Sequence, residues 1–400
     1  MFIVMLQFYS PTPAPDMHEM AKALRNWGHR VWVGTPDLDG DFCFDEGGTE
    51  VARISGPGQN ILKGANRSAL AAITRRLTSF TFMLRVRKFL DQIHPDVVQV
   101  NPFGFAFLFP ISRRDQSVYI LDVRQAGEGW ENNFLGKFRN WRIGLKHRIN
   151  ARYFYHHACF ASPPAAERIL GPNWKAWATI HRVGQDPSFL SHQWGTTSPS
   201  VGEGPIRFVY IGGIARVRQL ELLLEAVRAV SLVRRDFSVD FIGPDKSNGF
   251  YQNLVEKWGM GDIVKFLPAV PYSFVAETIA SYDVALAYVP PLPDWQYQPT
   301  LKVLEYRALG MPIIASDNQA NRLIVEHGEN GLLVEHSLTG IAEGIRHLLD
   351  DRALLAQITK TARDRRLGRT WEQSAREYLD LVYVPYISTL NKTKRALETR

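Results

Sequence analysis

The stretch Phe208-Val-Tyr-Ile-Gly-Gly-Ile-Ala-Arg-Val-Arg-Gln-Leu-Glu-Leu-Leu-Leu-Glu-Ala226 decides how the C-terminal half of this chain folds. An apolar run of strand length ends at two adjacent glycines, and apolar residues then recur at helical spacing from residue 219 to residue 230. A second apolar run, Phe237 to Gly243, follows closely. Strand, glycine turn, helix and strand in that order build parallel sheets covered by helices. The sequence therefore predicts an α/β fold.

The same alternation extends in both directions from this unit. A segment rich in Ser, Thr, Gly and Pro, residues 191–204, interrupts it and is predicted to be a linker. The first helix is expected to have Asp16 as its N-cap and to end at Gly28. We therefore expect two doubly wound, Rossmann-like units with an interdomain cleft, since such sheets bind ligands outside the carboxyl ends of their strands. Further strands are predicted at residues 2–9, 29–35, 96–100, 117–123, 206–212, 263–267, 284–289 and 312–316, and helices at 273–282, 300–309, 338–367 and 371–383.

The composition excludes several classes of protein. The 400 residues are 45% hydrophobic and 22% charged, which is typical of a globular chain long enough for two domains. The two cysteines, Cys43 and Cys159, argue against a disulfide framework and favour a reducing cytoplasm. No basic segment precedes the apolar Phe2–Leu6, so a signal peptide is not expected, and no apolar run reaches the length of a spanning helix.

The net charge of +7 is unevenly distributed. Residues 60–152 hold 16 Lys and Arg against 6 Asp and Glu. A solvated basic face, an anionic membrane surface, an anionic lipid-linked acceptor and nucleic acid are all compatible with this excess. No nucleic-acid recognition motif accompanies it. Because basic residues alternate with aromatic ones at 137–152, and Phe103–Phe109 is apolar, we expect peripheral contact with the inner face of a membrane and no nucleic-acid partner.

The segment Gln298 to Ser316 carries the first candidate chemistry. Thr300 is a plausible N-cap, and the free amides that follow it, from Leu301 onward, would form an anion site with the helix dipole. Lys302 would add a mobile cation, and Glu305, one turn further, could accept both hydroxyls of a ribose. This combination suits a nucleoside diphosphate. An ordinary exposed Glu–Lys pair would have the same spacing.

The glycine turn is the second candidate. Gly212 and Gly213 permit a phosphate to approach the backbone closely, and Arg216 and Arg218 could hold it bidentately. The third glycine of the dinucleotide fingerprint is missing, which argues against that class of site. Solvated arginines are the alternative interpretation.

Taken together, these blocks resemble family 4 of the glycosyltransferases, which has the GT-B fold. Ile211 to Ala226 resembles the strand, loop and helix that bind the diphosphate, with Arg218 at a position usually Lys or Arg. Leu267 ends a block resembling the strand whose backbone reads the base, and Glu305 matches the ribose-binding acid. Similar blocks include Gly28–Val31, His94–Val98, Val183–Pro187 with Phe189, Asn330–Val334 and Trp371.

The resemblance implies an activity and a domain layout. The reaction would be retaining, metal-independent transfer of a sugar from a UDP- or GDP-type donor, with no cofactor, to a glycan or lipid-linked acceptor in polysaccharide biosynthesis. Arg218 and Lys302 would be the catalytic residues, because they stabilise the departing diphosphate. The expected domains are 1–190 on the acceptor side, 205–370 for the donor, and a segment 371–400 that crosses back to the first domain.

The chain also departs from the family pattern. Tyr297 stands where a first Glu is usual, and a subset with a P-x-K-x-x-E-Y signature, to which we expect the chain to belong, lacks that Glu. Ser10 to Pro15 replaces the usual glycine-rich first loop, and Gly213 replaces an Arg. The family's sugar-facing His aligns with Arg124, close to Asp122, so these two residues are expected on the sugar or acceptor side.

Two further hypotheses of function remain open. The chain could be a nucleotide-sugar-binding module without catalysis, or an epimerase, although no acid–base carboxylates for the latter are identified. Asp37-Leu-Asp39 fits a metal-binding Asp-x-Asp pattern, but it lies in an acidic segment and is interpreted as a solvated loop. His156 and His157 are adjacent and suit metal chelation poorly. No metal site is expected.

Overall fold

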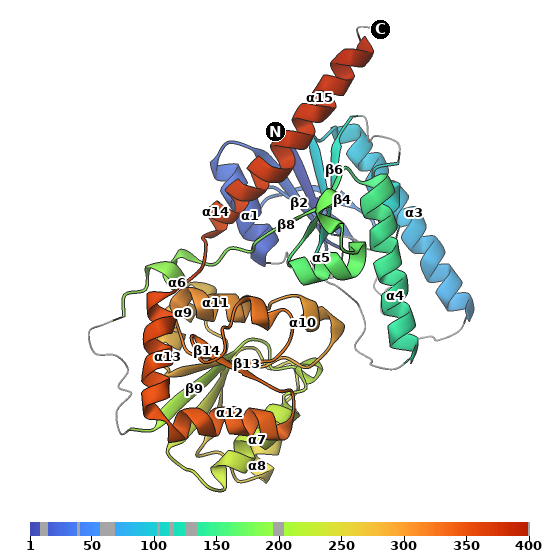
Figure 1. The fold of residues 1–400 in the computed structure, drawn as a ribbon. Coiled ribbons are helices and arrows are strands. Elements are labelled where there is room, and N and C mark those ends of the chain that lie inside the picture. The colour runs from blue at the N-terminus through green and yellow to red at the C-terminus, as the bar shows by residue number, and fades with distance from the viewer. Residues whose placement is uncertain are drawn as a thin grey trace. The chain divides into compact units, whose positions relative to one another are not determined.

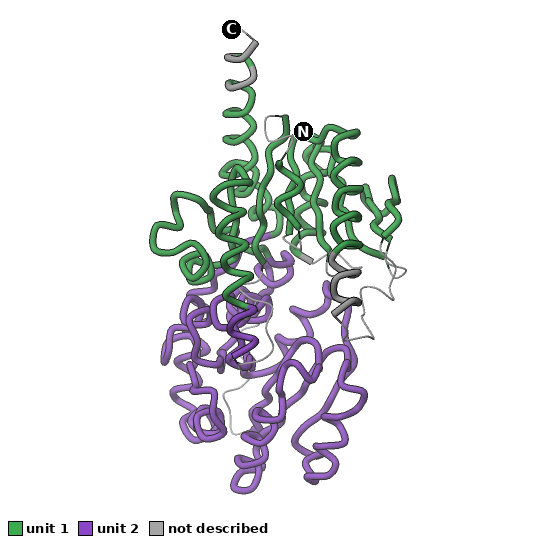
Figure 2. Tube along the Cα trace, turned by 90° about the vertical axis from the view of Figure 1, so that its right-hand side faces the viewer, with its two compact units in different colours: residues 1–126, 140–184, 371–400 green, residues 127–139, 185–370 purple. Residues whose placement is uncertain are grey.

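A computed structural model describes the backbone of residues 1–8, 15–37, 41–56, 69–101, 105–111, 116–124, 134–194 and 204–398. The chain divides into two compact units, shown in Figure 2. Unit 1 comprises residues 1–126, 140–184 and 371–400, and unit 2 comprises residues 127–139 and 185–370. The segment from residue 371 to the C-terminus therefore groups with the N-terminal part of the chain.

Unit 1 is built on an eight-stranded sheet with the order β4-β3-β2-β1-β5-β6-β7-β8. Strands β1, β2 and β5 to β8 run parallel, whereas β3 pairs antiparallel with both β2 and β4. The strands are β1 (Phe2–Leu6), β2 (Arg30–Pro36), β3 (Phe42–Asp45), β4 (Glu50–Ile54), β5 (Val97–Val100), β6 (Val118–Val123), β7 (His157–Phe160) and β8 (Ala178–Ile180).

Helices cover both faces of this sheet (Figure 1). One face packs against α1 and the C-terminal helices through residues such as Met20, Leu24 and Tyr383. The other carries an aromatic cluster in which Phe42 stacks on Phe8 with ring centroids 4.9 Å apart. The helices are α1 (Pro15–Asn26), α3 (Ala69–Ile93), α4 (Phe134–Ile149, in this unit from residue 140 onward), α5 (Pro163–Leu170), α14 (Trp371–Tyr378) and α15 (Val384–Glu398), with π-helical turns at Asn150–Phe154 and Leu379–Tyr383.

Unit 2 is built on a six-stranded, fully parallel sheet with the order β11-β10-β9-β12-β13-β14. This is the doubly wound arrangement, in which the chain reverses its direction of winding between β9 and β12. The strands are β9 (Ile206–Ile211), β10 (Phe237–Ile242), β11 (Val264–Leu267), β12 (Val284–Ala287), β13 (Ile313–Ser316) and β14 (Gly331–Val334).

The sheet of unit 2 is likewise buried between two layers of helices (Figure 1). One core cluster joins the sheet to α7, α8, α12 and α13, and a second joins it to α6, α9 and α11. Burial on both faces explains why its strands read as continuous apolar runs. The helices are α6 (Pro187–Ser191), α7 (Glu221–Ser231), α8 (Phe250–Lys257), α9 (Val275–Ala280), α10 (Pro293–Tyr297), α11 (Leu301–Leu309), α12 (Leu338–Asp350) and α13 (Arg352–Asp364).

The boundary between the units lies earlier than residue 190. The main segment of unit 2 begins at Gln185 because α6 and the residues after it pack on this unit. The Trp194 indole donates to the carbonyl of Leu309, 2.9 Å away, and the Arg366 guanidinium donates to the carbonyls of Leu190 and His192, both 2.7 Å away. The predicted linker therefore contributes to the core of unit 2 at its N-terminal end, and residues 195–203 lie outside the described residues.

Several predicted element boundaries need correction. Helix α1 begins at Pro15, so Asp16 lies inside its first turn instead of capping it. Its predicted end is confirmed, since Gly28 has a φ of 81°. The acidic segment after β2, predicted to be a solvated loop, contains strand β3, which pairs with β4 in a hairpin. Among the described residues, no helix is both long enough and apolar enough to cross a membrane.

Candidate functional site

The candidate site lies in unit 2 at the carboxyl end of β9, next to the point between β9 and β12 where the direction of winding reverses. Gly212 follows β9 directly and has a φ of 134°, a conformation that favours glycine. A Cβ built on Gly212 would lie 3.4 Å from the Lys302 Nζ, so the glycine turn and the start of α11 are in contact. The Tyr306 hydroxyl accepts a hydrogen bond from the amide of Ile211 at 3.0 Å and fastens α11 to the end of β9.

Lys302 is buried at this contact, with 6% of its surface exposed. Its Nζ lies 3.4 Å from the centroid of the Tyr210 ring, a cation–π contact. The same Nζ has no hydrogen-bond partner among the described residues. Burial holds the pKa of Lys302 well below its usual value, and the positive charge of Arg218 lowers it further, whereas Glu305 acts in the opposite direction. A buried amine without an acceptor is costly unless a ligand supplies one.

Arg218 faces the same region from the loop after β9. Its guanidinium carbon lies 4.4 Å from the centroid of the Trp295 ring, and its Nη1 is buried with no hydrogen-bond partner among the described residues. The next residue, Gln219, has a left-handed backbone with a φ of 48°, and its carbonyl accepts a hydrogen bond from the Tyr288 hydroxyl at 2.8 Å. The loop is therefore held in a strained conformation that positions Arg218.

Glu305 lies one turn after Lys302 and is 5% exposed. Its Oε1 has no hydrogen-bond partner among the described residues. Burial raises the pKa of Glu305 to about 7, and the nearby Tyr272 hydroxyl and the Lys302 ammonium oppose that rise. The carboxylate is thus shielded from water, and its Oε1 can accept a hydrogen bond from a ligand on the face of α11 that also carries Lys302.

Thr300, the predicted N-cap, is the N-cap of α11 in the structure. Its side chain makes no capping hydrogen bond. The amides at the start of α11, from Leu301 onward, therefore have no partner in the Thr300 side chain, and the dipole of this nine-residue helix favours an anion there.

The remaining residues that the sequence predicts to bind the donor are placed less centrally. Arg216 is half exposed, and its Nη1 pairs with Glu221 at 2.8 Å while its guanidinium stacks 3.6 Å from the centroid of the Phe250 ring. Arg216 therefore contacts Glu221 and Phe250, and not the region around Arg218 and Lys302. Gly213 has open space around its Cβ position, and Leu267 is the last residue of β11.

Sequence reasoning missed two supports of this site. A Cβ on Gly243, which has a φ of 152°, would lie 2.1 Å from the carbonyl oxygen of Gly212, so the two loops meet where only glycine fits. The second is the aromatic pair Tyr210 and Trp295, which holds the two cations. Gly243 at the end of the predicted strand 237–243 was the available sequence signal for the contact between the two loops. The contacts of Tyr210 and Trp295 with the cations have no sequence signature.

Asp122 and Arg124 lie in unit 1 and form a buried network there. The Arg124 Nε donates to Asp122 at 2.7 Å, and its Nη1 pairs with Asp16 at the start of α1. Gln99 donates to the other oxygen of Asp122 at 2.7 Å, and the Tyr383 hydroxyl donates to Gln99. Burial raises the pKa of Asp122, and Arg124 opposes that rise. The network joins α1, β5, β6 and the C-terminal helices.

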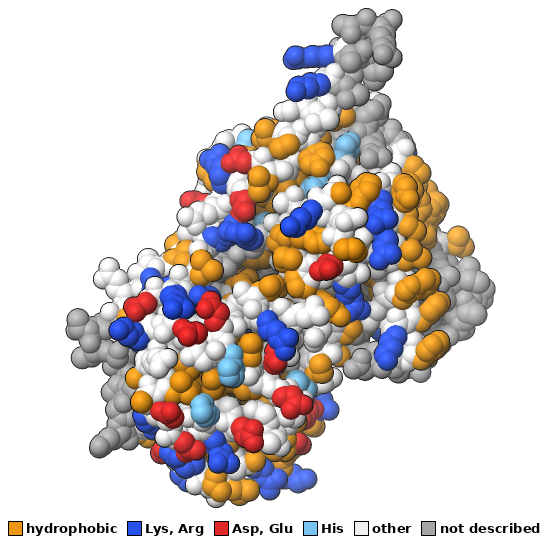
Figure 3. Space-filling view, in the orientation of Figure 1, with side chains coloured by type: hydrophobic (Ala, Val, Ile, Leu, Met, Phe, Trp, Pro, Cys, Tyr) orange, Lys and Arg blue, Asp and Glu red, His pale blue; other side chains and the backbone are white. Residues whose placement is uncertain are grey.

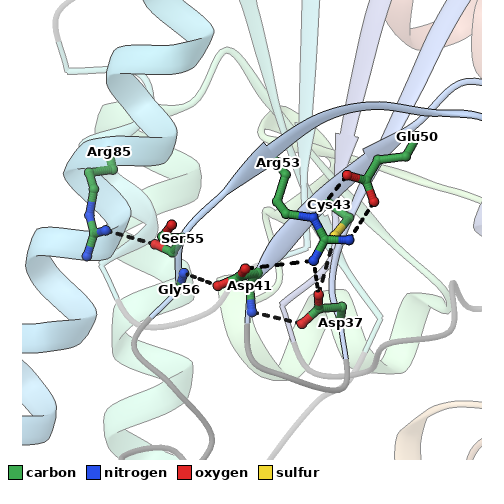
Figure 4. A network of polar contacts seen from close by, with 8 residues as sticks. All are labelled: Asp37, Asp41, Cys43, Glu50, Arg53, Ser55, Gly56 and Arg85. Carbon is green, nitrogen blue, oxygen red and sulfur yellow. Dashed lines mark hydrogen bonds and ion pairs between the residues drawn. The ribbon is translucent and has the colours of Figure 1, made fainter.

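The residues considered for a metal have other partners (Figure 4). Arg53 binds Glu50 through two hydrogen bonds of 3.0 and 2.7 Å and Asp37 through one of 2.5 Å, and it forms an ion pair with Asp41. Asp39 lies outside the described residues. Within the described part of the chain, no three His, Cys, Asp or Glu side chains gather as a metal site.

The adjacent histidines point to separate partners. The His156 Nδ1 accepts a hydrogen bond from the amide of Tyr119 at 3.0 Å. The two ring nitrogens of His157 contact the hydroxyls of Thr179 and Tyr386, both 2.7 Å away. These contacts have structural roles in unit 1.

Comparison with known proteins gives the site its context. Residues 205–351 match the family model described as glycosyl transferases group 1. The O-antigen biosynthesis protein RfbC of Myxococcus xanthus is 28% identical over 117 residues, 29% of this chain and 9% of that protein. The D-inositol 3-phosphate glycosyltransferase of Geodermatophilus obscurus is 28% identical over 166 residues, 39% of this chain and 36% of that protein. The chain thus matches well under half the length of these relatives.

Solved structures resemble the chain over nearly its whole length. Sucrose-phosphate synthase from Thermosynechococcus elongatus has a TM-score of 0.70 and 17% identity, with 95% of this chain and 97% of that chain covered. HepE of Anabaena in complex with UDP and glucose has a TM-score of 0.65 and 14% identity, with 96% and 100% covered. WaaG, a glycosyltransferase involved in lipopolysaccharide biosynthesis, has a TM-score of 0.61 and 17% identity, with 97% and 98% covered.

The expected P-x-K-x-x-E-Y signature is wrong in its spacing, because two residues, Thr300 and Leu301, stand between Pro299 and Lys302. The chain has the GT-B fold, and its residues 205–351 match the family model of the group 1 glycosyl transferases.

Proposed function

We propose that this protein is a glycosyltransferase that moves a sugar from a nucleoside diphosphate sugar to an acceptor hydroxyl. One observation carries the proposal. Arg218, Lys302 and Glu305 each bring a buried polar atom without a hydrogen-bond partner among the described residues to one region of unit 2. Two cations and a carboxylate at the carboxyl edge of a doubly wound sheet match the diphosphate and the ribose of a nucleotide.

Each residue has a role in this reaction. Arg218 and Lys302 stabilise the negative charge that grows on the departing diphosphate, together with the amides that follow Thr300. Glu305 accepts the ribose hydroxyls and does no acid–base chemistry. Gly212 and Gly213 let the phosphates approach the backbone, and Leu267 lies beside the base. Arg216 is a secondary candidate, because Glu221 already neutralises it.

The proposed transfer retains anomeric configuration and needs no metal. The two side-chain cations supply the charge for which other enzymes use a divalent ion. Transfer that persists in excess chelator supports this proposal, and activity that vanishes and returns with manganese contradicts it. A UDP-sugar is the first donor to test, because HepE was solved with UDP and glucose; a GDP-sugar is the second.

The proposed acceptor is a glycan or a lipid-linked glycan in polysaccharide biosynthesis. RfbC is described as an O-antigen biosynthesis protein, and WaaG as a glycosyltransferase involved in lipopolysaccharide biosynthesis. The positive excess in residues 60–152 suits an anionic acceptor and a peripheral position on the cytoplasmic face of a membrane.

A binding module without catalysis is the second candidate. The observation that favours it is the pairing of Arg124 with Asp16 and Asp122, because the residue at the expected sugar-facing position is already neutralised by two carboxylates. Product analysis with UDP- and GDP-sugars distinguishes the candidates. A new glycoside supports the transferase, tight nucleotide binding without any product supports the module, and an altered free sugar supports an epimerase.

A further inference from the structure

Helix α4, Phe134–Ile149, buries uncharged polar residues and exposes large apolar residues. Asn140 and His147 on this helix, and Asn150 directly after it, are exposed by only 7%, 3% and 2%. The Nδ1 of His147 and the Nδ2 of Asn150 have no hydrogen-bond partner among the described residues. Surface helices of globular proteins normally have the opposite arrangement, with an apolar stripe toward the core.

The outward face of α4 is a continuous apolar stripe. Its members recur at spacings of four, three, four and four residues, so they lie within an arc of about 80° on a helix that turns about 100° per residue. The three aromatic members are each at least half exposed, which is unusual for side chains of this size. The stripe consists of Phe134 (80% exposed), Phe138 (50%), Trp141 (60%), Leu145 (39%) and Ile149 (41%).

Basic side chains border this stripe, and no acidic residue occurs from residue 134 to residue 153. Lys137, Arg139 and Arg142 are exposed. Arg148 and Arg152 instead donate to the carbonyls at the end of α5, at 2.7 and 3.0 Å, and hold α4 in place. Figure 3 shows blue and orange side chains alternating over α4. An exposed surface that combines apolar and positive groups without a carboxylate suits an apolar, negatively charged partner.

We propose that α4 docks the protein on an anionic lipid bilayer, with the stripe inserted at the headgroup level and Lys137, Arg139 and Arg142 on the lipid phosphates. The inference rests on the membrane contact in the proposed function and narrows it to one helix. A bilayer is favoured over a protein because a helix with Trp and Phe between cations fits the interface where hydrocarbon meets anionic headgroups.

The test is sedimentation of the full chain with vesicles of phosphatidylcholine alone or with phosphatidylglycerol, at low and high salt. One variant, Phe138→Ser with Trp141→Ser, removes the stripe, and a second, Arg139→Gln with Arg142→Gln, removes two cations. The matched control is Leu232→Ser with Val233→Ser, since these unit 2 residues are 76% and 69% exposed. Far-ultraviolet circular dichroism and thermal melting establish that each variant is folded.

Wild type and control should bind the anionic vesicles, and salt should weaken this binding. The cation variant should lose about 25-fold in affinity, at roughly fivefold for each of its two cations, and the stripe variant should lose at least as much. Wild type that binds no vesicles, or variants that bind like wild type, would overturn the proposal. A dimer that the stripe variant dissociates, or binding to polyglutamate as tight as to vesicles, would assign the surface to a protein partner and also overturn it.

The same variants separate this proposal from the proposed function. UDP affinity depends on Arg218, Lys302 and Glu305 in the proposed function and should be unchanged in both α4 variants. Docking through α4 without any sugar transfer by wild type would uphold the inference and contradict the proposed function. Transfer to a soluble acceptor without docking would do the reverse.

Discussion

Replacing Glu305 with Gln should stabilise the protein and weaken nucleotide binding at the same time. Glu305 has a pKa of about 7 in the folded chain, against an ordinary value of 4.5. The folded state therefore binds this proton more tightly than the unfolded chain does, so its contribution to stability is present below pH 4.5 and is lost as the pH rises through about 7. At pH 8 the ionised carboxylate costs about 3 kcal/mol, at about 1.4 kcal/mol per pKa unit.

The neutral amide introduced by Glu305→Gln has no such cost, but it also loses the attraction to the Lys302 ammonium. The expected net gain is therefore about 1–3 kcal/mol at pH 8 and less than about 1 kcal/mol at pH 5. Nucleotide affinity should fall by at least about tenfold, because a hydrogen bond to a charged group contributes about 1.5–3 kcal/mol.

Two measurements check these numbers. Urea unfolding of the full chain at pH 5 and pH 8 gives the difference in stability between wild type and variant, and calorimetric titration with UDP gives the affinity. Glu256→Gln on the exposed side of α8 is the control, and it should change neither quantity. A variant that binds UDP like wild type would refute the ribose assignment. If the difference in stability is the same at both pH values, the claim that burial raises the pKa of Glu305 is refuted.

Three further predictions concern the same sheet edge. Arg218→Ala and Lys302→Ala should each lower kcat by about 10²–10³ with a smaller change in donor Kd; initial rates that match wild type would remove the residue concerned from the diphosphate site. Gln219→Gly should relieve the left-handed strain and raise stability by about 1 kcal/mol with turnover retained, and a lower melting temperature would show that the side chain contributes. Gly243→Ala should cost about 2 kcal/mol or more, because its Cβ would overlap the carbonyl of Gly212; urea unfolding equal to wild type would contradict this.

The fold of unit 2 could be predicted from the sequence because its strands are buried on both faces. A strand such as Phe237–Ile242 is then an apolar run between turn residues, and its helices show a plain 3.6-residue period. Lys302 and Glu305 could be predicted because their spacing on one helix is a local property. The aromatic contacts of Lys302 and Arg218 could not be predicted, since Tyr210 lies on a strand and Trp295 on a short helix, and only the tertiary structure brings these rings to the two cations.

The structure of unit 1 was harder to predict from the sequence, for a physical reason. The edge strand of the β3–β4 hairpin carries the charged residues Glu50 and Arg53. Arg53 binds Glu50 and also pairs with Asp37 and Asp41, which precede β3. Because this segment is rich in charge, its sequence resembles that of a solvated loop. The buried set of Arg124, Asp122 and their partners joins residues from both ends of the chain. No spacing rule reports a contact of that kind.

Local rules fail at both places in this protein to which function is assigned. In unit 2 a lysine and a glutamate are buried with atoms that have no hydrogen-bond partner among the described residues, although burying charge is costly. Helix α4 buries Asn140 and His147 and exposes Phe138 and Trp141. A sequence specifies its fold when local preference and tertiary environment agree, and disagreement between the two is expected at functional sites. A nucleotide would provide anions and hydroxyls for the first site, and a bilayer would provide hydrocarbon and phosphate for the second. Because each assignment rests on its own violation, the Glu305 and α4 variants test them independently.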